Sequence, residues 1–195
     1  MKENKKRIAI FASGEGSNAE AIAIHFENHA SIDVAMIISN KQEAGVHRRI
    51  SRFAIPSYIF DKSVWQSGEG KGNEVLALLD KEQIDLIVLA GFLAFIPNSI
   101  VNAYKGRIIN IHPSLLPKYG GKGMWGHHVH EAVIDAHEEE SGITIHHVTD
   151  KLDEGEIIFQ ASCNVLPDDT PDSLAARIHQ LEHKHYPSVV EQMLS

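Results

Sequence analysis

Asn110 and His112 are the two residues whose types and spacing most directly suggest chemistry. They follow an apolar strand pattern, and Pro113 biases His112 toward extended backbone. In an extended segment residues i and i+2 point to the same side, so an amide donor and an imidazole can converge on one reacting atom. Such a pair suits a reaction in which an oxyanion forms and a proton moves. The alternative is a strand-end histidine that only caps a turn.

An acidic loop could supply a carboxylate partner for this imidazole. The stretch Thr149–Gly155 lies between two predicted strands and carries Asp150 and Asp153. Such loops are usually only solvated turns, and composition does not choose between the two aspartates.

A glycine-rich turn follows the first predicted strand. Gly14–Ala19 satisfies G-x-G-x-x-A, the pattern of a dinucleotide-binding turn. A nicotinamide site also needs an acidic residue at the end of the second strand, and that strand ends in Ser39–Lys41 instead. We therefore expect a phosphate site, in which helix N-terminal amides are joined by Ser17 and Asn18 as donors. A plain glycine-rich turn is the alternative.

Histidine spacings offer a competing hypothesis. His179–His183 matches H-x-x-E-H, a zinc hydrolase pattern, and 127–130 and 146–147 also resemble metal-ligand spacings. With 13 histidines in the chain such spacings are expected by chance. A zinc hydrolase is thus a minority hypothesis, and a catalytically silent phosphate-binding module is a third.

Alternating strand and helix patterns position these residues. They predict an α/β fold with a doubly wound, mainly parallel, Rossmann-like sheet, followed by an antiparallel C-terminal strand pair and a long C-terminal helix. We expect that last helix to be bent or interrupted near Pro187. The expected strands are 7–12, 32–39, 57–60, 85–91, 107–110, 142–149 and 156–165, and the expected helices are 19–26, 45–53, 73–83, 128–137 and 171–194.

Composition sets the class of protein. The chain of 195 residues, 43% hydrophobic and 23% charged, predicts a single globular domain over 1–195, with a phosphate-binding half (1–105) and a catalytic half (106–195). A lone cysteine, Cys163, excludes an intrachain disulfide and favours the cytoplasm. We expect neither a signal peptide nor a membrane span. The net charge of −8 argues against a nucleic-acid binder.

Together these motifs resemble the folate-dependent formyltransferase superfamily. Asn-x-His-Pro-Ser with a distant Leu-Asp-x-Gly is specific to the superfamily, and the early Gly-x-Gly-Ser-Asn favours its glycinamide ribonucleotide branch. The resemblance covers about residues 6–187. Its matching segments are Ser13–Asn18, Ile38–Lys41, Val88–Phe92, Asn110–Tyr119, His147–Gly155 and Glu182–His183.

The resemblance implies an enzyme of purine biosynthesis that transfers the formyl group of 10-formyltetrahydrofolate to the amine of 5'-phosphoribosylglycinamide. The amine would attack directly, Asn110 would hold the oxyanion, His112 would stabilise it and relay the proton, and Asp153 would pair with His112. It implies small-molecule substrates, no metal, no nucleic acid, no membrane, and a monomer or homodimer.

The resemblance also assigns the binding positions. Gly16, Ser17 and Asn18 would bind the substrate phosphate, and Glu182 the ribose hydroxyls or the amine side. Thr144 and His146 match positions that line the site. The folate would lie against Leu93, Ala94, Phe95, Ile96, Asn110, Val148, Thr149 and Asp150.

Three departures from the family's pattern bear on the folate contacts. The family often has an arginine where this chain has Ala94, a basic residue in the loop that is 68–72 here, and a shorter Pro-Gly turn in place of Gly120–Gly126. We expect these departures to leave the catalytic residues untouched.

Overall fold

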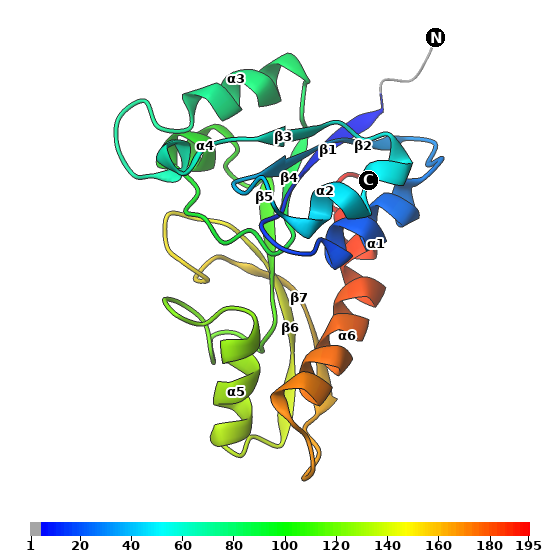
Figure 1. The fold of residues 1–195 in the computed structure, drawn as a ribbon, viewed down its shortest axis with the longest axis vertical. Helices are drawn as coiled ribbons and strands as arrows, with labels where there is room; N and C mark the ends of the chain where they lie inside the picture. Colours follow the sequence, from blue (N-terminus) through cyan, green and yellow to red (C-terminus); the bar gives the residue numbers. More distant parts are fainter. Residues whose placement is uncertain (1–4) are drawn as a thin grey trace.

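The centre of the computed structural model, which describes residues 5–195, is a seven-stranded sheet of order β3-β2-β1-β4-β5-β6-β7 (Figure 1). Strands β1 to β5 pair in parallel, whereas β6 runs antiparallel to both β5 and β7. This confirms the predicted fold class. The strands are β1 (Lys6–Phe11), β2 (Ile32–Ser39), β3 (Ser57–Ile59), β4 (Leu86–Leu89), β5 (Ile108–His112), β6 (Glu140–His147) and β7 (Ile157–Asn164).

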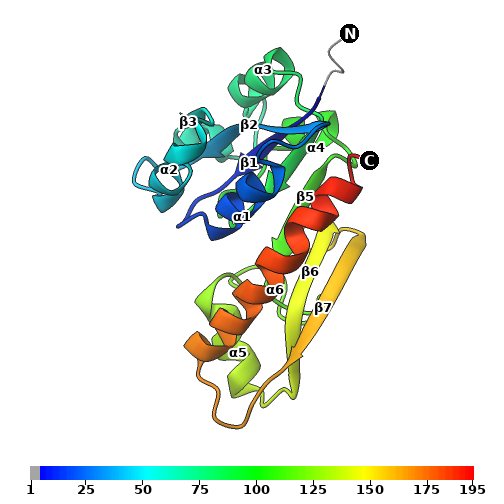
Figure 2. The same ribbon diagram turned by 90° about the vertical axis from the view of Figure 1, so that its right-hand side faces the viewer.

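Helices cover both faces of this sheet (Figures 1 and 2). On one face α1 (Ser17–Phe26), α2 (Gly45–Arg49) and α6 (Pro171–Gln192) bury one hydrophobic cluster. On the other face α3 (Asn73–Lys81) and α4 (Asn98–Ala103) bury a second one. The remaining α-helix, α5 (His127–Asp135), packs beside α6. Among residues 5–195, no helix is both long enough and apolar enough to cross a membrane.

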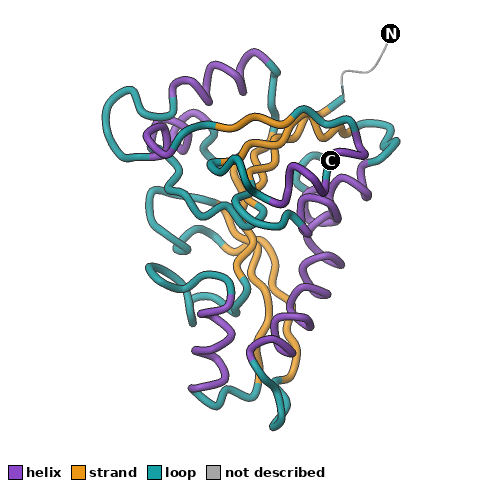
Figure 3. The backbone as a smooth tube through the Cα atoms, in the orientation of Figure 1, coloured by secondary structure: helices purple, strands orange, loops and turns teal. Residues whose placement is uncertain are grey.

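Strand alternation decides which side chains of β5 and β6 face which cluster. Ile109 and Ile111 of β5, with Ile143 and Ile145 of β6, belong to the cluster under α1 and α6. Because successive side chains of a strand point to opposite faces, the even-numbered residues of both strands project from the other face. The loops that follow β4, β5 and β6 gather near that face, on the left of Figure 3.

We expected a bend or an interruption near Pro187, and of these two the interruption is wrong, because the long C-terminal helix is continuous through Pro187. It begins with a capping box in which Thr170 accepts from the Ser173 backbone N–H. A proline inside a helix removes one backbone hydrogen bond. Here the burial of Tyr186 and Val189 against the sheet supplies the packing that keeps the helix intact.

Most other differences from the predicted elements are shifts at their ends. The helix expected over 45–53 ends at Arg49, and a separate 3-10 turn, Ser51–Phe53, follows it. Helix α4 was not predicted, because its six residues are too few to show a helical apolar period.

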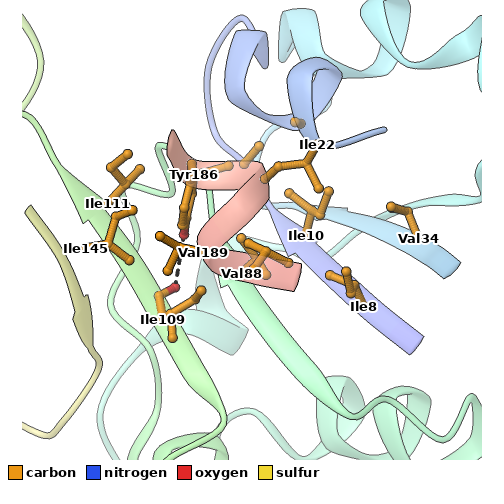
Figure 4. Close-up of a cluster of buried hydrophobic side chains, with 14 of the residues drawn as sticks. Ile8, Ile10, Ile22, Val34, Val88, Ile109, Ile111, Ile145, Tyr186 and Val189 are labelled. Atoms are coloured by element: carbon orange, nitrogen blue, oxygen red, sulfur yellow. Dashed lines mark hydrogen bonds between the residues drawn. The ribbon is translucent and has the colours of Figure 1, made fainter. Parts of the chain in front are cut away.

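Tyr186 joins the C-terminal helix to the middle of the sheet (Figure 4). Its side chain is fully buried, and its hydroxyl lies 2.9 Å from the carbonyl oxygen of Leu89 and 3.3 Å from that of Ile109. The single hydroxyl hydrogen is therefore shared between a carbonyl at the end of β4 and a carbonyl near the start of the neighbouring β5. These are the strands that precede two of the loops gathered near the site face.

Replacing Tyr186 by phenylalanine tests this link. The Tyr186→Phe variant should lose about 1–2 kcal/mol of unfolding free energy, because a buried donor is removed while its carbonyl acceptors stay buried. Chemical denaturation measures this loss. Tyr58→Phe is the matched control, since Tyr58 is only half-buried and lies on the edge strand β3. Equal effects of the two substitutions would contradict the assignment.

Candidate active site

Asn110 and His112 lie on one face of β5, opposite two polar residues of β6. The strand register pairs Asn110 with His146 and His112 with Thr144. Nδ2 of Asn110 lies 3.2 Å from Nε2 of His146. The spacing of two residues thus does bring the amide and the imidazole to the same side, as the sequence predicts.

The His112 imidazole is buried between two oxygen atoms. Its Nε2 lies 2.7 Å from the carbonyl oxygen of Tyr119, and its Nδ1 lies 3.7 Å from Oδ2 of Asp153. A carbonyl oxygen can only accept, so the Nε2–H of His112 donates to Tyr119. The Asp153 carboxylate faces the other ring nitrogen, at a distance longer than a hydrogen bond.

Asp153 is the carboxylate that reaches this pair, whereas Asp150 lies exposed at the surface. The Asp153 side chain is only 8% exposed. Its Oδ2 accepts the backbone N–H of Gly121 at 2.8 Å, and its Oδ1 lies 3.6 Å from Nε2 of His146. Its backbone has a φ of 56°, in the left-handed region that aspartate tolerates better than most residues. Such strain often accompanies a functional position.

Gly155 lets the loop that carries Asp153 return close to β6. A Cβ atom at this position would overlap the carbonyl oxygen of His147, so no other residue fits without moving the backbone. The glycine of Leu-Asp-x-Gly is therefore a steric requirement of this close approach.

The glycine-rich segment Gly120–Gly126 and the residue before it contact the catalytic candidates through backbone atoms. The Gly121 N–H binds Asp153, and the preceding carbonyl of Tyr119 binds His112. Tyr119 and Gly121 both have positive φ, of 55° and 87°. These contacts come from backbone atoms, so side-chain chemistry gave no signal for them.

The turn after β1 presents the N-terminus of α1. Gly16 precedes the helix with a φ of 78°, and no side chain caps the first amides. A Cβ at Gly16 would come within 2.6 Å of the Val46 side chain, so the turn packs tightly on α2. Uncapped N–H groups with the positive end of the helix dipole form an anion site.

Asn18 and Glu182 connect this turn to the C-terminal helix. Nδ2 of Asn18 donates to Oε2 of Glu182 at 2.9 Å, and both residues are buried. Oδ1 of Asn18 has no hydrogen-bond partner within the described residues. Burial raises the pKa of Glu182, and the hydrogen bond from Asn18 opposes that rise. Oδ1 of Asn18, in the first turn of α1, is thus available to accept a hydrogen bond from a ligand.

Ser13 is a connecting residue whose role the sequence did not reveal. Its hydroxyl donates to Oδ1 of Asn40 at 2.6 Å and accepts the Leu93 N–H at 2.8 Å, and its own N–H donates to the Gly91 carbonyl. It therefore ties together the loops after β1, β2 and β4. From β1 the chain first adds strands β2 and β3 on one side, and then returns to add β4 on the other side of β1. α/β sheets usually bind ligands at such a reversal of strand order.

The expected folate positions fall in two segments that share one hydrophobic cluster. Ile96 belongs to the cluster under α3 and α4, and Ala94 and Val148 pack against it. Leu93 and Phe95 are 51% and 47% exposed. These segments thus leave two large apolar side chains, Leu93 and Phe95, exposed to solvent. Thr149 and Asp150 are also exposed.

Thr144 lies beneath the site and not at its surface. Its hydroxyl is fully buried, donates to the Ser114 carbonyl at 2.7 Å and accepts the Leu116 N–H at 2.9 Å. Gln160 of β7 donates to the same oxygen at 2.8 Å. Thr144 therefore fixes the turn that follows His112.

The zinc hypothesis finds no ligand set in the described part of the chain. Residues 5–195 contain no group of three or more histidine, cysteine, aspartate or glutamate side chains placed to hold a metal ion. Glu182 of the H-x-x-E-H pattern faces Asn18 instead. Burial, with the charges of His179, His127 and His112, lowers the pKa of His130 to about 4.

Comparison with known proteins identifies the family. The family model described as "Formyl transferase" matches residues 6–190. The chain is 38% identical to Bacillus subtilis phosphoribosylglycinamide formyltransferase, over 97% of this chain and 95% of that protein. It is also 38% identical to the chloroplastic phosphoribosylglycinamide formyltransferase of Arabidopsis thaliana, over 95% of this chain and 64% of that protein. It thus spans less than two thirds of the plant relative.

A solved structure agrees with these relatives. Glycinamide ribonucleotide transformylase 1 from Geobacillus kaustophilus superposes with a TM-score of 0.89 at 35% identity, covering 98% of this chain and all of that one. Sequence match and fold agree over nearly the whole described chain. The chain belongs to the formyl transferase family.

Proposed function

We propose that this chain transfers the formyl group of 10-formyltetrahydrofolate to the amine of 5'-phosphoribosylglycinamide, a step of purine biosynthesis. The observation that carries the proposal is that Asn110 and His112 share one face of β5 and that Asp153 faces His112, in a chain that also presents an uncapped helix N-terminus at α1. We further propose that the enzyme acts on these small molecules in the cytoplasm, as a monomer or homodimer.

Substrate binding would use the turn after β1 and the C-terminal helix. The free amides of Gly16, Ser17 and Asn18 suit a phosphate, because backbone N–H groups and the helix dipole both favour an anion. The buried Glu182 would accept hydrogen bonds from the ribose hydroxyls. Both contacts are local, which fits a chain whose net charge of −8 would otherwise repel a phosphate.

The folate would lie over Leu93–Ile96 and Val148–Asp150. The exposed apolar side chains of Leu93 and Phe95 suit a flat, largely apolar ring system. Backbone groups of the same segments would satisfy the polar edge of that ring.

The chemistry would proceed through a tetrahedral intermediate. The substrate amine attacks the formyl carbon, a carbon–nitrogen bond forms, and the formyl oxygen becomes an oxyanion. An N–H of Asn110 donates to that oxyanion, and His112 stabilises it as an imidazolium. The proton lost by the attacking amine reaches the folate nitrogen by way of His112, and the bond from carbon to that nitrogen then breaks.

The imidazole would need to change one partner during this reaction. In the structure its Nε2 bonds the Tyr119 carbonyl. The oxyanion would replace that carbonyl as the acceptor, while Asp153 continues to face Nδ1. Asp153 would then stabilise the positive ring in the transition state.

The purified chain, given both proposed substrates, tests the reaction. Tetrahydrofolate should appear, by its absorbance, only when 5'-phosphoribosylglycinamide is present, and mass spectrometry should find the formylated amine. Binding of both substrates without turnover would instead indicate a silent phosphate-binding module. Activity on neither, with stoichiometric zinc in the protein, would favour the hydrolase.

Asparagine at positions 153 and 150 distinguishes the two aspartates of the loop. Asp153→Asn should lower kcat by about 10²- to 10⁴-fold, because it removes the negative partner of the imidazolium while asparagine keeps the left-handed backbone. Asp150→Asn should change mainly the KM for the folate, by less than about tenfold, since its side chain is exposed. Steady-state kinetics on both variants measures the difference. The reverse ranking would overturn the role of Asp153.

Glutamine at position 182 separates binding from stability. Because burial raises its pKa, Glu182 enters the folded protein as a carboxylate at neutral pH only against a desolvation penalty. Glu182→Gln should therefore be more stable than the parent at pH 7. Its advantage should shrink as pH falls toward the ordinary glutamate range, where the parent carboxyl is protonated. Denaturant unfolding at several pH values measures this.

The same variant should bind the phosphorylated substrate less well. We expect its KM for 5'-phosphoribosylglycinamide to rise about tenfold, which corresponds to about 1.4 kcal/mol. The control is Glu139→Gln, the same exchange at an exposed position, which should alter neither quantity. A Glu182→Gln variant that is less stable at every pH would contradict the burial argument.

A further inference from the structure

We propose that His146 is a positioning residue for the formyl transfer: a neutral imidazole whose bare Nε2 holds the Asn110 amide with its N–H groups toward the reaction. The inference rests on the proposed function and assigns His146 a role without contact to the substrate.

The tautomer of His146 follows from its neighbour. Nδ1 of His146 lies 2.9 Å from the carbonyl oxygen of His147. A carbonyl oxygen can only accept, so Nδ1 carries the hydrogen. In a neutral ring the other nitrogen, Nε2, is then an acceptor.

This acceptor decides the orientation of the Asn110 amide. Nε2 lies 3.2 Å from Nδ2 of Asn110, and a bare nitrogen can bond the NH₂ end of an amide but not its oxygen. One of the two Nδ2 hydrogens is used in this bond, and the second remains for another acceptor. If the amide turned over, its oxygen would take the place of that donor and repel an oxyanion.

Burial and charge keep His146 in the neutral form that this role requires. The residue is 2% exposed, and burial lowers its pKa, as do the charges of His112 and His147. The bond to the His147 carbonyl and the charge of Asp153 act in the opposite direction. A protonated ring would instead direct an Nε2 hydrogen toward Oδ1 of Asp153, which is 3.6 Å away.

The strand pairing makes this contact rigid. Asn110 and His146 are directly opposite in the antiparallel ladder of β5 and β6. Their side chains therefore share one face without help from a mobile loop. A residue that holds a catalytic group from a rigid neighbouring strand should act on kcat through that group.

A double-mutant cycle in kcat tests the proposal. His146→Leu removes the acceptor and should lower kcat by about 10- to 100-fold, because the donor is misoriented for much of the time. His146→Gln should recover most of that loss, since its side-chain oxygen can reach the position of Nε2. In an Asn110→Ala background, His146→Leu should lower kcat by less than about twofold further, because the group it positions is already absent.

Two results would overturn the role. One is an undiminished effect of His146→Leu in the Asn110→Ala background, which would mean that His146 acts independently of Asn110. The other is a glutamine variant no better than leucine. The control is His185→Leu, the same substitution at a histidine of α6 whose ring packs on Phe159. This variant should keep the kcat of the parent.

A spectroscopic measurement tests the tautomer separately from activity. Nitrogen-15 NMR of labelled protein near pH 7 should show the His146 ring neutral, with its hydrogen on Nδ1. A hydrogen on Nε2 would overturn the inference even in an active enzyme. Absence of formyl transfer by the parent, with the Nδ1 tautomer present, would refute the proposed function and leave the geometric part of the inference standing.

Discussion

The pairing of β5 with β6 is the constraint on which the rest of the site depends. Its antiparallel register sets Asn110 opposite His146 and His112 opposite Thr144. The isoleucines between them turn to the other face and are buried under α6, so a slip of one residue would exchange the catalytic face with the core. The hydrophobic core thereby fixes the direction of the polar side chains.

The class of the sheet and the shared direction of Asn110 and His112 were accessible from the sequence for different reasons. Near-continuous apolar strands predicted a covered parallel sheet, and the two-residue spacing of Asn110 and His112 predicted a shared direction. Asp153 was not separable from Asp150 by composition. What distinguishes them is a backbone at φ 56° and the close approach at Gly155, which only the folded loop defines.

Other parts of the site depend on contacts that local sequence does not encode. The Tyr119 carbonyl and the Gly121 amide are backbone groups, so any residue type could supply them. Ser13 carries no signature either, although its hydroxyl joins three loops. The continuity of α6 through Pro187 is likewise a tertiary effect, in which burial of neighbouring side chains outweighs a helix-breaking preference.

Two buried carboxylates of the site have different surroundings, and the difference matches their proposed roles. Asp153 accepts a backbone N–H and faces two imidazoles, so its negative charge has partners on several sides. Glu182 accepts one amide hydrogen from Asn18, and burial raises its pKa. A carboxylate with several partners is held in place to pair with the imidazolium that the proposed mechanism forms at His112. One with few partners gains its missing hydrogen bonds only when a ligand brings donors, which makes it a binding group whose desolvation is offset by the substrate itself.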